Sequence, residues 1–481
     1  MILASFTHLW NPIGFPDIFY DEGIYMRRTM HVLEGLGPQE SYFYDHPFFG
    51  QLFLAATLGI IGYPDSLNPY SGDAHSIEML YTIPRIIIGI LAVIDTLLIY
   101  KISERYYNWK VALFASLLYA VMPITWITRR ILLDSILLPF VLSSIFFAIY
   151  LGYSNRKFVA ILFSGISLGL AIFTKIPIIT MIPLVAFLIF MNSNKNLKMV
   201  GLWLIPVILI PLIWPAHAAF FGQFELWLKD VIWQAERQNS GGFSSIVMFF
   251  FLVDPVLLIL SFAGIVFAAI KKNYFLLLWI VPFMVFLSVI GFVQYFYWIP
   301  ILPAFCIAAA VFTIHLLEKI AIPKSRTMLL FAIISSIIIF GLVNITILIT
   351  SDISAQFQAA AFILKYIEEK DDNNSNYDVT LISSPVYSWI FNYLSNKENV
   401  VTDYRDLLYY PIQTKEFLLI ADPHFKSNIR SGRQLQDIYE NTTLIKTFKG
   451  DVFDFDLDRY PYTSMRKNYE GSTIEVRIGR R

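Results

Sequence analysis

Long apolar runs, each about the length of a membrane-crossing helix, fill the sequence between residues 78 and 350. A helix needs roughly 20 apolar residues to cross the hydrocarbon layer of a bilayer. The runs predict ten spanning helices, at 78–100, 111–128, 135–152, 158–174, 176–191, 199–216, 246–270, 273–292, 297–318 and 327–350. We therefore expect a mainly α protein whose transmembrane domain, a polytopic helical bundle, occupies residues 78–350.

The residues before the first run follow a different pattern. Asn11, Pro12 and Asp17 interrupt the early apolar positions, so no first span is evident in residues 1–77. The uncharged segment 47–63 is barely long enough to cross a membrane. We favour a helix lying along the membrane surface, which makes residues 1–77 an external loop with short surface helices. If the segment spanned instead, the residues before it would face the cytoplasm.

The pattern of the tail, residues 351–481, predicts a small α/β domain. The stretch "SAQFQAAAFILKYIEEK" has apolar residues at helical spacing. Short strand-like segments follow between turn-rich stretches, namely "YDVTLISS", "NVVTDY", "EFLLIAD", "TTLIKTF" and "TIEVRIG". Two Asn-x-Ser/Thr sequons, weak matches on their own, begin at Asn373 and Asn441.

Composition supports an integral membrane protein. The chain is 57% hydrophobic and 15% charged, whereas soluble domains carry about 25% charged residues. The formal net charge is zero, which implies no bulk attraction to nucleic acid. The single cysteine, Cys306, cannot form an internal disulfide. No cleavable signal peptide is evident.

Basic residues in the short loops predict the orientation of the bundle. If the ten spans alternate, these basic clusters all fall on one side of the membrane: Lys101, Arg105, Lys110, Arg156, Lys157, Lys195, Lys198, Lys271, Lys272, Lys319, Lys324 and Arg326. The positive-inside rule assigns that side to the cytoplasm. Residues 1–77, the loop 217–245 and the tail are then extracytoplasmic, and we expect a multi-pass protein of the plasma membrane.

Four cations break this pattern, because they lie at the outer ends of spans: Arg85, Arg129, Arg130 and Lys175. A charge at membrane depth costs about 2.5–3.5 kcal/mol on insertion scales, so it usually has a partner or a function. Snorkelling, or pairing with Asp95 or Asp134, would explain any one of them. For four cations on the same side, we favour binding of an anionic ligand.

Acidic residues before residue 50 give the other half of a candidate site. Asp21 and Glu22 lie in "PDIFYDEGIYMRR", and Asp45 and His46 lie in "YFYDHPFFGQ". Each group precedes a helix-like stretch, so acids at ordinary helix starts are the simplest interpretation. Two such groups within about 25 residues, both flanked by aromatic residues, nevertheless suggest a shared pocket.

In their order along the chain, six motifs resemble those of the C-type glycosyltransferase superfamily. The chain is most similar to protein O-mannosyltransferases and aminoarabinose transferases. The motifs cover roughly residues 15–305 and are the Asp21-Glu22 pair with its following helix, "DHP" at Asp45, "PRIIIGILAV" with Arg85, "RRILLDSILLPF" with Asp134, "GLAIFTKIP" with Lys175, and "YWIPILP" from Tyr297. The family's usual first span is missing, so we expect an N-terminally incomplete gene model or an N-terminus that crosses without a preceding helix.

The resemblance implies an enzyme that moves a sugar, with inversion, from a polyprenyl (dolichyl) phosphate donor such as dolichyl-phosphate-mannose to an extracytoplasmic acceptor. In such an enzyme Asp21 would be the general base and Glu22 would orient it or the acceptor. The four cations Arg85, Arg129, Arg130 and Lys175 would bind the donor phosphate. Asp45, His46, Asp134 and Tyr297 would shape the substrate pocket. No cofactor is certain, and a divalent metal held near His46 stays open.

Two questions remain open on the sequence alone. The acceptor can be a protein hydroxyl, a lipid or a polysaccharide. A flippase for lipid-linked sugars or another membrane transporter is the alternative function. A transporter favours repeated halves with broken helices at the membrane midplane, whereas the unusual charges here lie at outer span ends.

Overall fold

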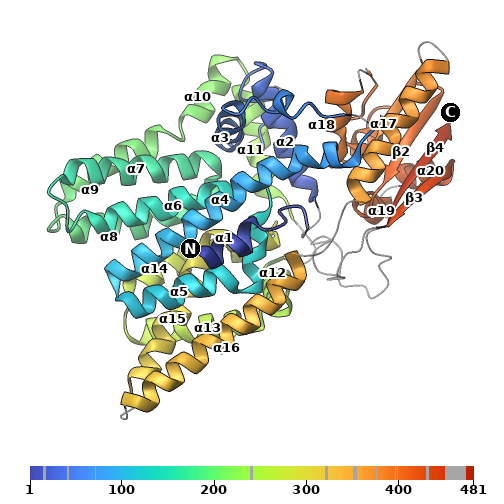
Figure 1. The fold of residues 1–481 in the computed structure, drawn as a ribbon. Helices are drawn as coiled ribbons and strands as arrows, with labels where there is room; N and C mark the ends of the chain where they lie inside the picture. Colours follow the sequence, from blue (N-terminus) through green and yellow to red (C-terminus); the bar gives the residue numbers. More distant parts are fainter. Residues whose placement is uncertain are drawn as a thin grey trace.

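The fold is given by a computed structural model of the 481-residue chain. The structure describes residues 1–14, 18–40, 43–70, 72–238, 242–319, 323–349, 355–373, 377–395, 397, 399–429, 433–449 and 473–481. Figure 1 shows a long helical region with a small α/β domain at one end of it. The prediction of a mainly α protein with a small C-terminal sheet is confirmed.

The helical region contains most of the apolar runs. Its helices, including the short 3₁₀ segments labelled η, are α1 (Ile2–Leu9), α2 (Tyr20–Leu33), α3 (Phe49–Gly59), η1 (Asp65–Leu67), α4 (Ala74–Tyr106), α5 (Trp109–Val121), η2 (Pro123–Arg129), α6 (Leu133–Tyr150), α7 (Lys157–Thr174), η3 (Ile176–Met181), α8 (Ile182–Asn192), α9 (Leu197–Leu209), α10 (Ile213–Phe220), α11 (Phe224–Glu236), α12 (Gly242–Val253), α13 (Pro255–Ile270), α14 (Tyr274–Val289), η4 (Tyr295–Ile301), α15 (Leu302–Glu318) and α16 (Pro323–Ile349).

Within the described residues, six helices are long and apolar enough to cross a membrane, or up to eight if each of two bent pairs is one span. The six are Ala74–Tyr106, Leu133–Tyr150, Lys157–Thr174, Leu197–Phe220, Tyr295–Glu318 and Thr327–Ile345. The predicted spans at 176–191 and 273–292 correspond to shorter apolar helices, Ile176–Asn192 and Tyr274–Val289. The count of ten spans therefore stays a prediction.

The predicted span at 246–270 is divided into two helices. Helices α12 and α13 meet there at an angle of 118°. The break lies at Asp254-Pro255, because proline has no N–H to donate and its ring opposes a continuing helix. The Asp254 carboxylate instead caps α13 by accepting a hydrogen bond from the Leu257 N–H at 2.9 Å. A similar break of 69° before Pro123 divides the predicted span at 111–128.

The segment 47–63 forms the short helix α3, of 11 residues. At 1.5 Å of rise per residue, it is about 16 Å long, roughly half of the hydrocarbon thickness. Helix α3 lies beside α2, toward the end of the helical region that carries the α/β domain (Figure 1). It is too short to cross a membrane as a straight helix.

The tail folds around a four-stranded sheet with the strand order β1-β2-β4-β3. Its elements are α17 (Ala355–Asn373), β1 (Val379–Ile382), α18 (Pro385–Leu394), η5 (Tyr404–Leu408), β2 (Glu416–Ala421), α19 (Pro423–Ile429), α20 (Arg433–Glu440), β3 (Thr442–Lys449) and β4 (Thr473–Arg480). Strands β1 and β2 are parallel, whereas β4 runs antiparallel to both of its neighbours.

Four of the five predicted strands are present. The fifth, "NVVTDY", makes only an isolated bridge between Val400 and Leu381, because the chain turns into η5 directly after it. The first predicted sequon extends into residues 374–376, which lie outside the described residues. The second begins at Asn441, an exposed residue between α20 and β3.

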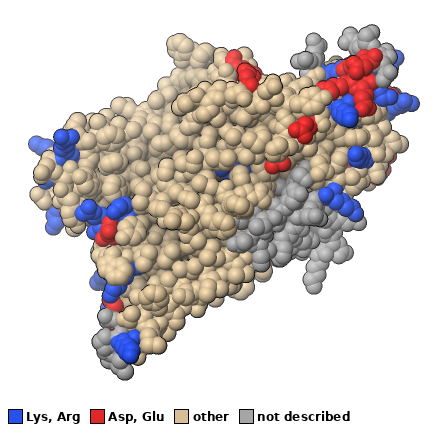
Figure 2. All heavy atoms as spheres, in the orientation of Figure 1, with Lys and Arg blue, Asp and Glu red and all other residues tan. Residues whose placement is uncertain are grey.

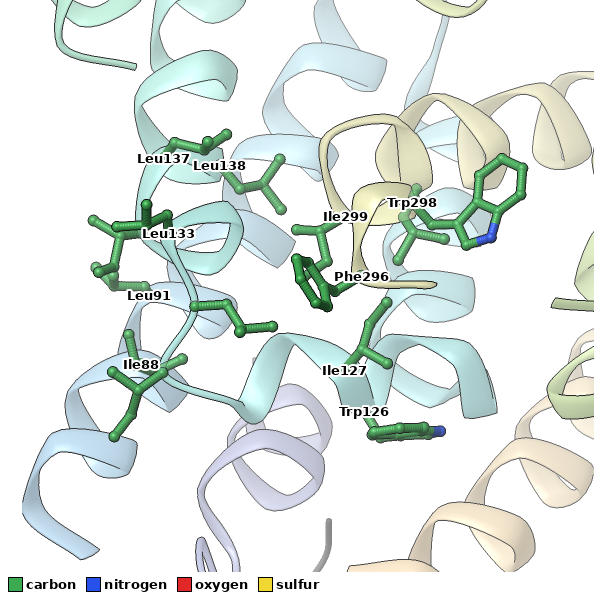
Figure 3. Packing of buried hydrophobic residues seen from close by; sticks show 14 of the residues in the cluster. Ile88, Leu91, Trp126, Ile127, Leu133, Leu137, Leu138, Phe296, Trp298 and Ile299 are labelled. Atoms are coloured by element: carbon green, nitrogen blue, oxygen red, sulfur yellow. The ribbon is translucent and has the colours of Figure 1, made fainter. Parts of the chain in front are cut away.

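The core of the helical region forms where α4, α6, η2 and η4 meet. Figure 3 shows buried side chains of these elements in one cluster, among them Ile88 and Leu91 of α4, Leu133 and Leu137 of α6, and Phe296 of η4. All five are buried. Helix α6 and segment η2 both pack against the aromatic segment η4.

Charged side chains are unevenly distributed on the surface. Figure 2 shows Lys and Arg gathered at the end of the helical region that is far from the α/β domain, with a broad uncharged belt between the two ends. Such a belt suits a lipid-facing surface. The picture agrees with the predicted orientation, which itself remains a proposal.

Candidate functional site

A cavity of about 130 Å³ lies where α2, α11, η4 and the α/β domain meet. Both acidic groups that the sequence singled out reach it, through Asp21 and through Asp45 with His46. Its described lining residues are Tyr20, Asp21, Ile24, Tyr25, Phe43, Asp45, His46, Lys175, Trp233, Gln234, Arg237, Phe292, Gln294, Phe296, Tyr297 and Arg405. The structure thus brings together Asp21, Asp45, His46, Lys175 and Tyr297 from four separate predicted motifs.

Asp21 lies in the first turn of α2 and lines the cavity. Among the described residues, none forms a hydrogen bond or ion pair with its carboxylate. Burial raises the pKa of Asp21 to about 6, although the positive charges of Lys175 and Arg237 act in the opposite direction. A carboxylate with this pKa is largely ionised at neutral pH and still basic enough to take a proton.

Lys175 follows the last residue of α7 and lies at the cavity wall. Its ammonium donates to Asp134 Oδ2 at 2.6 Å and lies 4.0 Å from the ring centre of Tyr297. Asp134 does not line the cavity. Its carboxylate instead holds the Lys175 ammonium in place. The ring of Tyr297 holds the charge from another side through a cation–π contact.

Arg237 is a cavity residue that the sequence reasoning missed. It follows the last residue of α11, and its guanidinium lies 3.8 Å from the ring centre of Phe292 and 5.0 Å from that of Trp233. It also donates to Gln234 Oε1 at 2.7 Å. In the sequence, 217–245 is a predicted loop between spans, and nothing in its pattern showed that Arg237 would share a cavity with Asp21.

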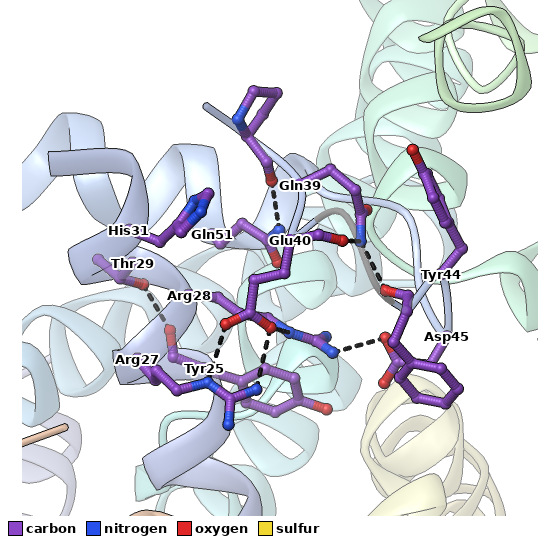
Figure 4. A network of polar contacts seen from close by, with 12 residues as sticks. Tyr25, Arg27, Arg28, Thr29, His31, Gln39, Glu40, Tyr44, Asp45 and Gln51 are labelled. Carbon is purple, nitrogen blue, oxygen red and sulfur yellow. Dashed lines mark hydrogen bonds and ion pairs between the residues drawn. The ribbon is translucent and has the colours of Figure 1, made fainter. Parts of the chain in front are cut away.

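Asp45 and His46 reach the cavity on a loop that is tied down by ion pairs. Arg28 Nη2 lies 2.8 Å from Asp45 Oδ1, and Glu40 joins Arg27 and Arg28 in the same network (Figure 4). Burial opposes ionisation of Asp45, but the Arg28 charge holds its pKa below the usual value. The loop position is therefore fixed from α2.

His46 is a neutral side chain at physiological pH. Burial lowers its pKa to about 4, because the nearby cations Lys175 and Arg28 add to the desolvation while Asp45 only partly offsets it. Its Nε2 lies 3.4 Å from Gln234 Nε2. Among the described residues, no group of three or more His, Cys, Asp or Glu side chains could hold a metal ion. The described residues around His46 do not fit such a site.

Glu22 points away from the cavity and into the protein. Its carboxylate is fully buried and accepts hydrogen bonds from Arg85 Nε at 2.9 Å and Arg85 Nη2 at 2.6 Å. The N–H groups of Phe19 and Ile131 donate to it as well, at 2.8 and 2.9 Å. Glu22 thus joins the start of α2 to α4 and to the segment before α6.

The three outer arginines also do not line the cavity. Arg85 pairs with Glu22, and Arg130 Nε lies 3.9 Å from the same carboxylate while its guanidinium packs over Phe19. Arg129 Nη2 donates to the carbonyl oxygens of Trp10 and Asn11, each at 2.6 Å. Of the four cations expected to bind phosphate, only Lys175 lines this cavity.

Comparisons with known proteins found one matching family model and several solved structures with a similar fold. The family model described as dolichyl-phosphate-mannose-protein mannosyltransferase matches residues 80–218. Comparison with curated proteins gave no significant match.

Solved structures with the same fold include ArnT from Cupriavidus metallidurans bound to undecaprenyl phosphate. It is 12% identical, with a TM-score of 0.57, over 99% of this chain and 96% of that chain. The archaeal oligosaccharyltransferase AglB from Archaeoglobus fulgidus, in complex with an inhibitory peptide and a dolichol-phosphate, is also 12% identical. Its TM-score is 0.52, over 88% of this chain and 68% of that chain. The chain has the fold of the C-type membrane glycosyltransferases, and it resembles their mannosyltransferases and aminoarabinose transferases.

Proposed function

We propose that this protein is a membrane glycosyltransferase that moves a sugar from a polyprenyl phosphate to a hydroxyl of an extracytoplasmic acceptor, with inversion at the anomeric carbon. One observation carries the proposal: Asp21, a carboxylate with no hydrogen-bonding partner among the described residues, shares one cavity with the cations Lys175 and Arg237. A base and a phosphate-binding pair in one polar cavity are the two requirements of this reaction.

Asp21 is the general base of the proposed reaction. Its carboxylate takes the proton of the acceptor hydroxyl as that oxygen attacks the anomeric carbon. The bond between this carbon and the phosphate oxygen breaks through an oxocarbenium-like state, and its electron pair stays on the phosphate. Attack from the face opposite the leaving group inverts the configuration. The pKa of about 6 keeps Asp21 mostly ionised at neutral pH.

Lys175 and Arg237 bind the phosphate on which negative charge develops. Preorganised cations at the site of developing charge stabilise a transition state without further reorganisation. Asp134 at 2.6 Å and the Tyr297 ring fix the lysine ammonium, and the Phe292 ring fixes the guanidinium. Arginine adds a planar fork of donors that matches phosphate oxygens. Asp45 and His46 shape the pocket, and Arg28 holds them in place.

Glu22, Arg85, Arg129 and Arg130 have a different role in this proposal. Glu22 pairs with Arg85 and lies near Arg130, which fixes the start of α2, whereas Arg129 holds the chain at Trp10 and Asn11. This reassigns the three arginines from phosphate binding to positioning, because their guanidiniums already contact Glu22 or backbone carbonyls.

The decisive experiment compares Asp21→Asn with Asp378→Asn, an acid of the α/β domain outside the cavity. Purified full-length protein is tested for transfer from polyprenyl-phosphate sugars and for binding of undecaprenyl phosphate. We expect Asp21→Asn to lower transfer about 10²–10⁴-fold, the usual contribution of a general base, with unchanged lipid binding, and Asp378→Asn to be active. Unchanged transfer in Asp21→Asn removes the residue from the mechanism. If the protein moved lipid-linked sugar from one leaflet of a vesicle membrane to the other and transferred no sugar to an acceptor, that result would favour a flippase.

A further inference from the structure

The α/β domain contributes a side chain to the cavity wall. Of the described residues that line the cavity, all come from positions 20–297 except Arg405. Arg405 lies in η5, the short segment that follows the isolated bridge at Val400. No motif singled out this arginine, because it lies about 100 residues beyond the last family-like motif.

The position of Arg405 is fixed by contacts on two sides. Its Nε and Nη2 donate to Asp403 Oδ2 at 2.9 and 2.6 Å, and its backbone N–H donates to Asp403 Oδ1 at 2.9 Å. Its guanidinium lies 4.6 Å from the ring centre of Tyr20, the residue just before Asp21. The Tyr20 hydroxyl in turn donates to Asp403. The half-exposed Arg405 side chain is therefore held at the wall of the cavity that Asp21 also lines.

The cationic residues of the cavity come from two different parts of the molecule. Lys175 and Arg237 follow α7 and α11 of the helical region, whereas Arg405 comes from the α/β domain. In the proposed function, the donor lipid stays in the membrane and its phosphate meets the first two cations. An acceptor arriving from water passes the α/β domain, so Arg405 is the cation that it meets.

We propose that Arg405 is a specificity-determining residue that binds an anionic group, a carboxylate or a phosphate, on the hydroxyl-bearing acceptor. A guanidinium presents a planar fork of donors that suits both kinds of oxyanion. Asp403 accepts from the Nε and Nη2 edge of this guanidinium, so an anionic ligand would approach its Nη1 side. The Asp403 and Tyr20 contacts hold the guanidinium in place, which reduces the entropy lost on binding. The inference rests on the proposed function, since it assigns the acceptor side of the same cavity.

The test measures binding of two acidic hydroxyl compounds and their neutral counterparts to the purified full-length protein. Methyl glucuronide is compared with methyl glucoside, and glycerol 3-phosphate with glycerol. The first pair reports a carboxylate and the second a phosphate. The variants are Arg405→Gln, Arg405→Lys and Arg480→Gln, the last an arginine of the same domain that pairs with Glu416 outside the cavity.

We expect the unmodified protein to bind at least one acidic compound about tenfold more tightly than its neutral counterpart, as a hydrogen-bonded charge pair contributes. Arg405→Gln should abolish this preference, Arg405→Lys should keep part of it, and Arg480→Gln should keep all of it. Binding of undecaprenyl phosphate should not change in any of them. Thermal unfolding of each variant checks that the fold is intact.

Three outcomes would overturn the proposal. They are an unmodified protein without preference for either acid, an Arg405→Gln variant that keeps the preference, and an equal loss of undecaprenyl phosphate binding in Arg405→Gln. The last would place Arg405 at the donor. Failure of the proposed function looks different: the acid preference would depend on Arg405 while no sugar transfer takes place.

Discussion

Asp21 and Glu22 are adjacent on the same helix, yet they belong to regions of opposite character. Glu22 lies in a closed region, where Arg85 and two backbone N–H groups satisfy its buried carboxylate. Asp21 lies in an open region, the cavity, with no hydrogen-bonding partner among the described residues. Successive helical residues point about 100° apart, so one helix start serves both regions.

The difference separates charges that hold the fold from charges that are available for chemistry. A buried ion pair offsets the cost of taking its charges out of water. A carboxylate without such a partner keeps a raised pKa and remains able to bind a substrate or accept a proton. The same distinction divides the cations, since Arg85 is paired inside the protein and Arg237 lines the cavity.

The largest expected effect is on the closed region. Glu22→Gln leaves the buried Arg85 guanidinium without its counter-charge, which typically costs about 3–5 kcal/mol. We expect a large drop in the midpoint of thermal unfolding in detergent and a low yield of folded protein. Asp21→Asn, one residue away, should unfold at nearly the midpoint of the unmodified protein. Equal stability of Glu22→Gln and the unmodified protein would contradict the division into two regions.

The next effect is on the open region. Arg237→Gln removes one of the two cations proposed for the leaving phosphate, and we expect sugar transfer to fall about 10–100-fold, in line with a lost charged hydrogen bond. Lys229→Gln, an exposed position on the same helix, is the matched control and should be fully active. Transfer rates with saturating donor measure the effect. An unaffected Arg237→Gln variant would leave Lys175 as the sole phosphate contact.

A smaller effect is expected where α2 meets the α/β domain. A Cβ at Gly23 would lie 2.4 Å from the backbone of Pro385, so Gly23→Ala must push α18 away from α2. We expect about 1–3 kcal/mol of destabilisation, as for other overpacked sites. Gly201→Ala is the control, because nothing lies within 4 Å of its Cβ position and alanine favours a helix. If Gly23→Ala unfolds at the same midpoint as Gly201→Ala, the two domains are not packed this closely.

The smallest effect is a dependence on pH. Because the raised pKa of Asp21 is about 6 and the base works only as a carboxylate, kcat/KM should be constant above this pH. It should fall about tenfold per unit as pH drops below it. In Arg237→Gln, the loss of a positive charge that lowers this pKa should move the decline to higher pH. A profile that is flat down to pH 5 would exclude Asp21 as the titrating base.

The sequence predicted the overall organisation well. The length of the apolar runs indicated a helical membrane domain, since about 20 apolar residues are what a helix needs to cross a bilayer. Strand-like alternation found β1, β2, β3 and β4. The local pattern did not predict the bend at Asp254-Pro255. The apolar run there indicated one spanning helix, whereas the structure has two helices at an angle of 118°. Hydrophobicity reports what a segment is buried in, not the direction in which it continues.

The candidate site was predictable only in part. Asp21, Asp45, His46, Lys175 and Tyr297 were singled out from motifs, and they line one cavity. Arg85, Arg129 and Arg130 were singled out by the same reasoning, because an outer-end cation looks alike in sequence whether a buried acid pairs it or not. Arg237 and Arg405 were missed, since each lies in a segment whose pattern indicates only a surface element.

The sequence by itself determined an apolar helical domain, a small α/β domain and the kinds of side chain available for chemistry, because these depend on local composition and periodicity. Only the tertiary structure decided which acid is paired and which faces the cavity, and which cations lie beside it. Those outcomes depend on contacts between residues far apart in the chain, such as Glu22 with Arg85 and Arg405 with Tyr20. The physical reason is that partnership, not residue type, sets whether a buried charge holds the fold or carries function.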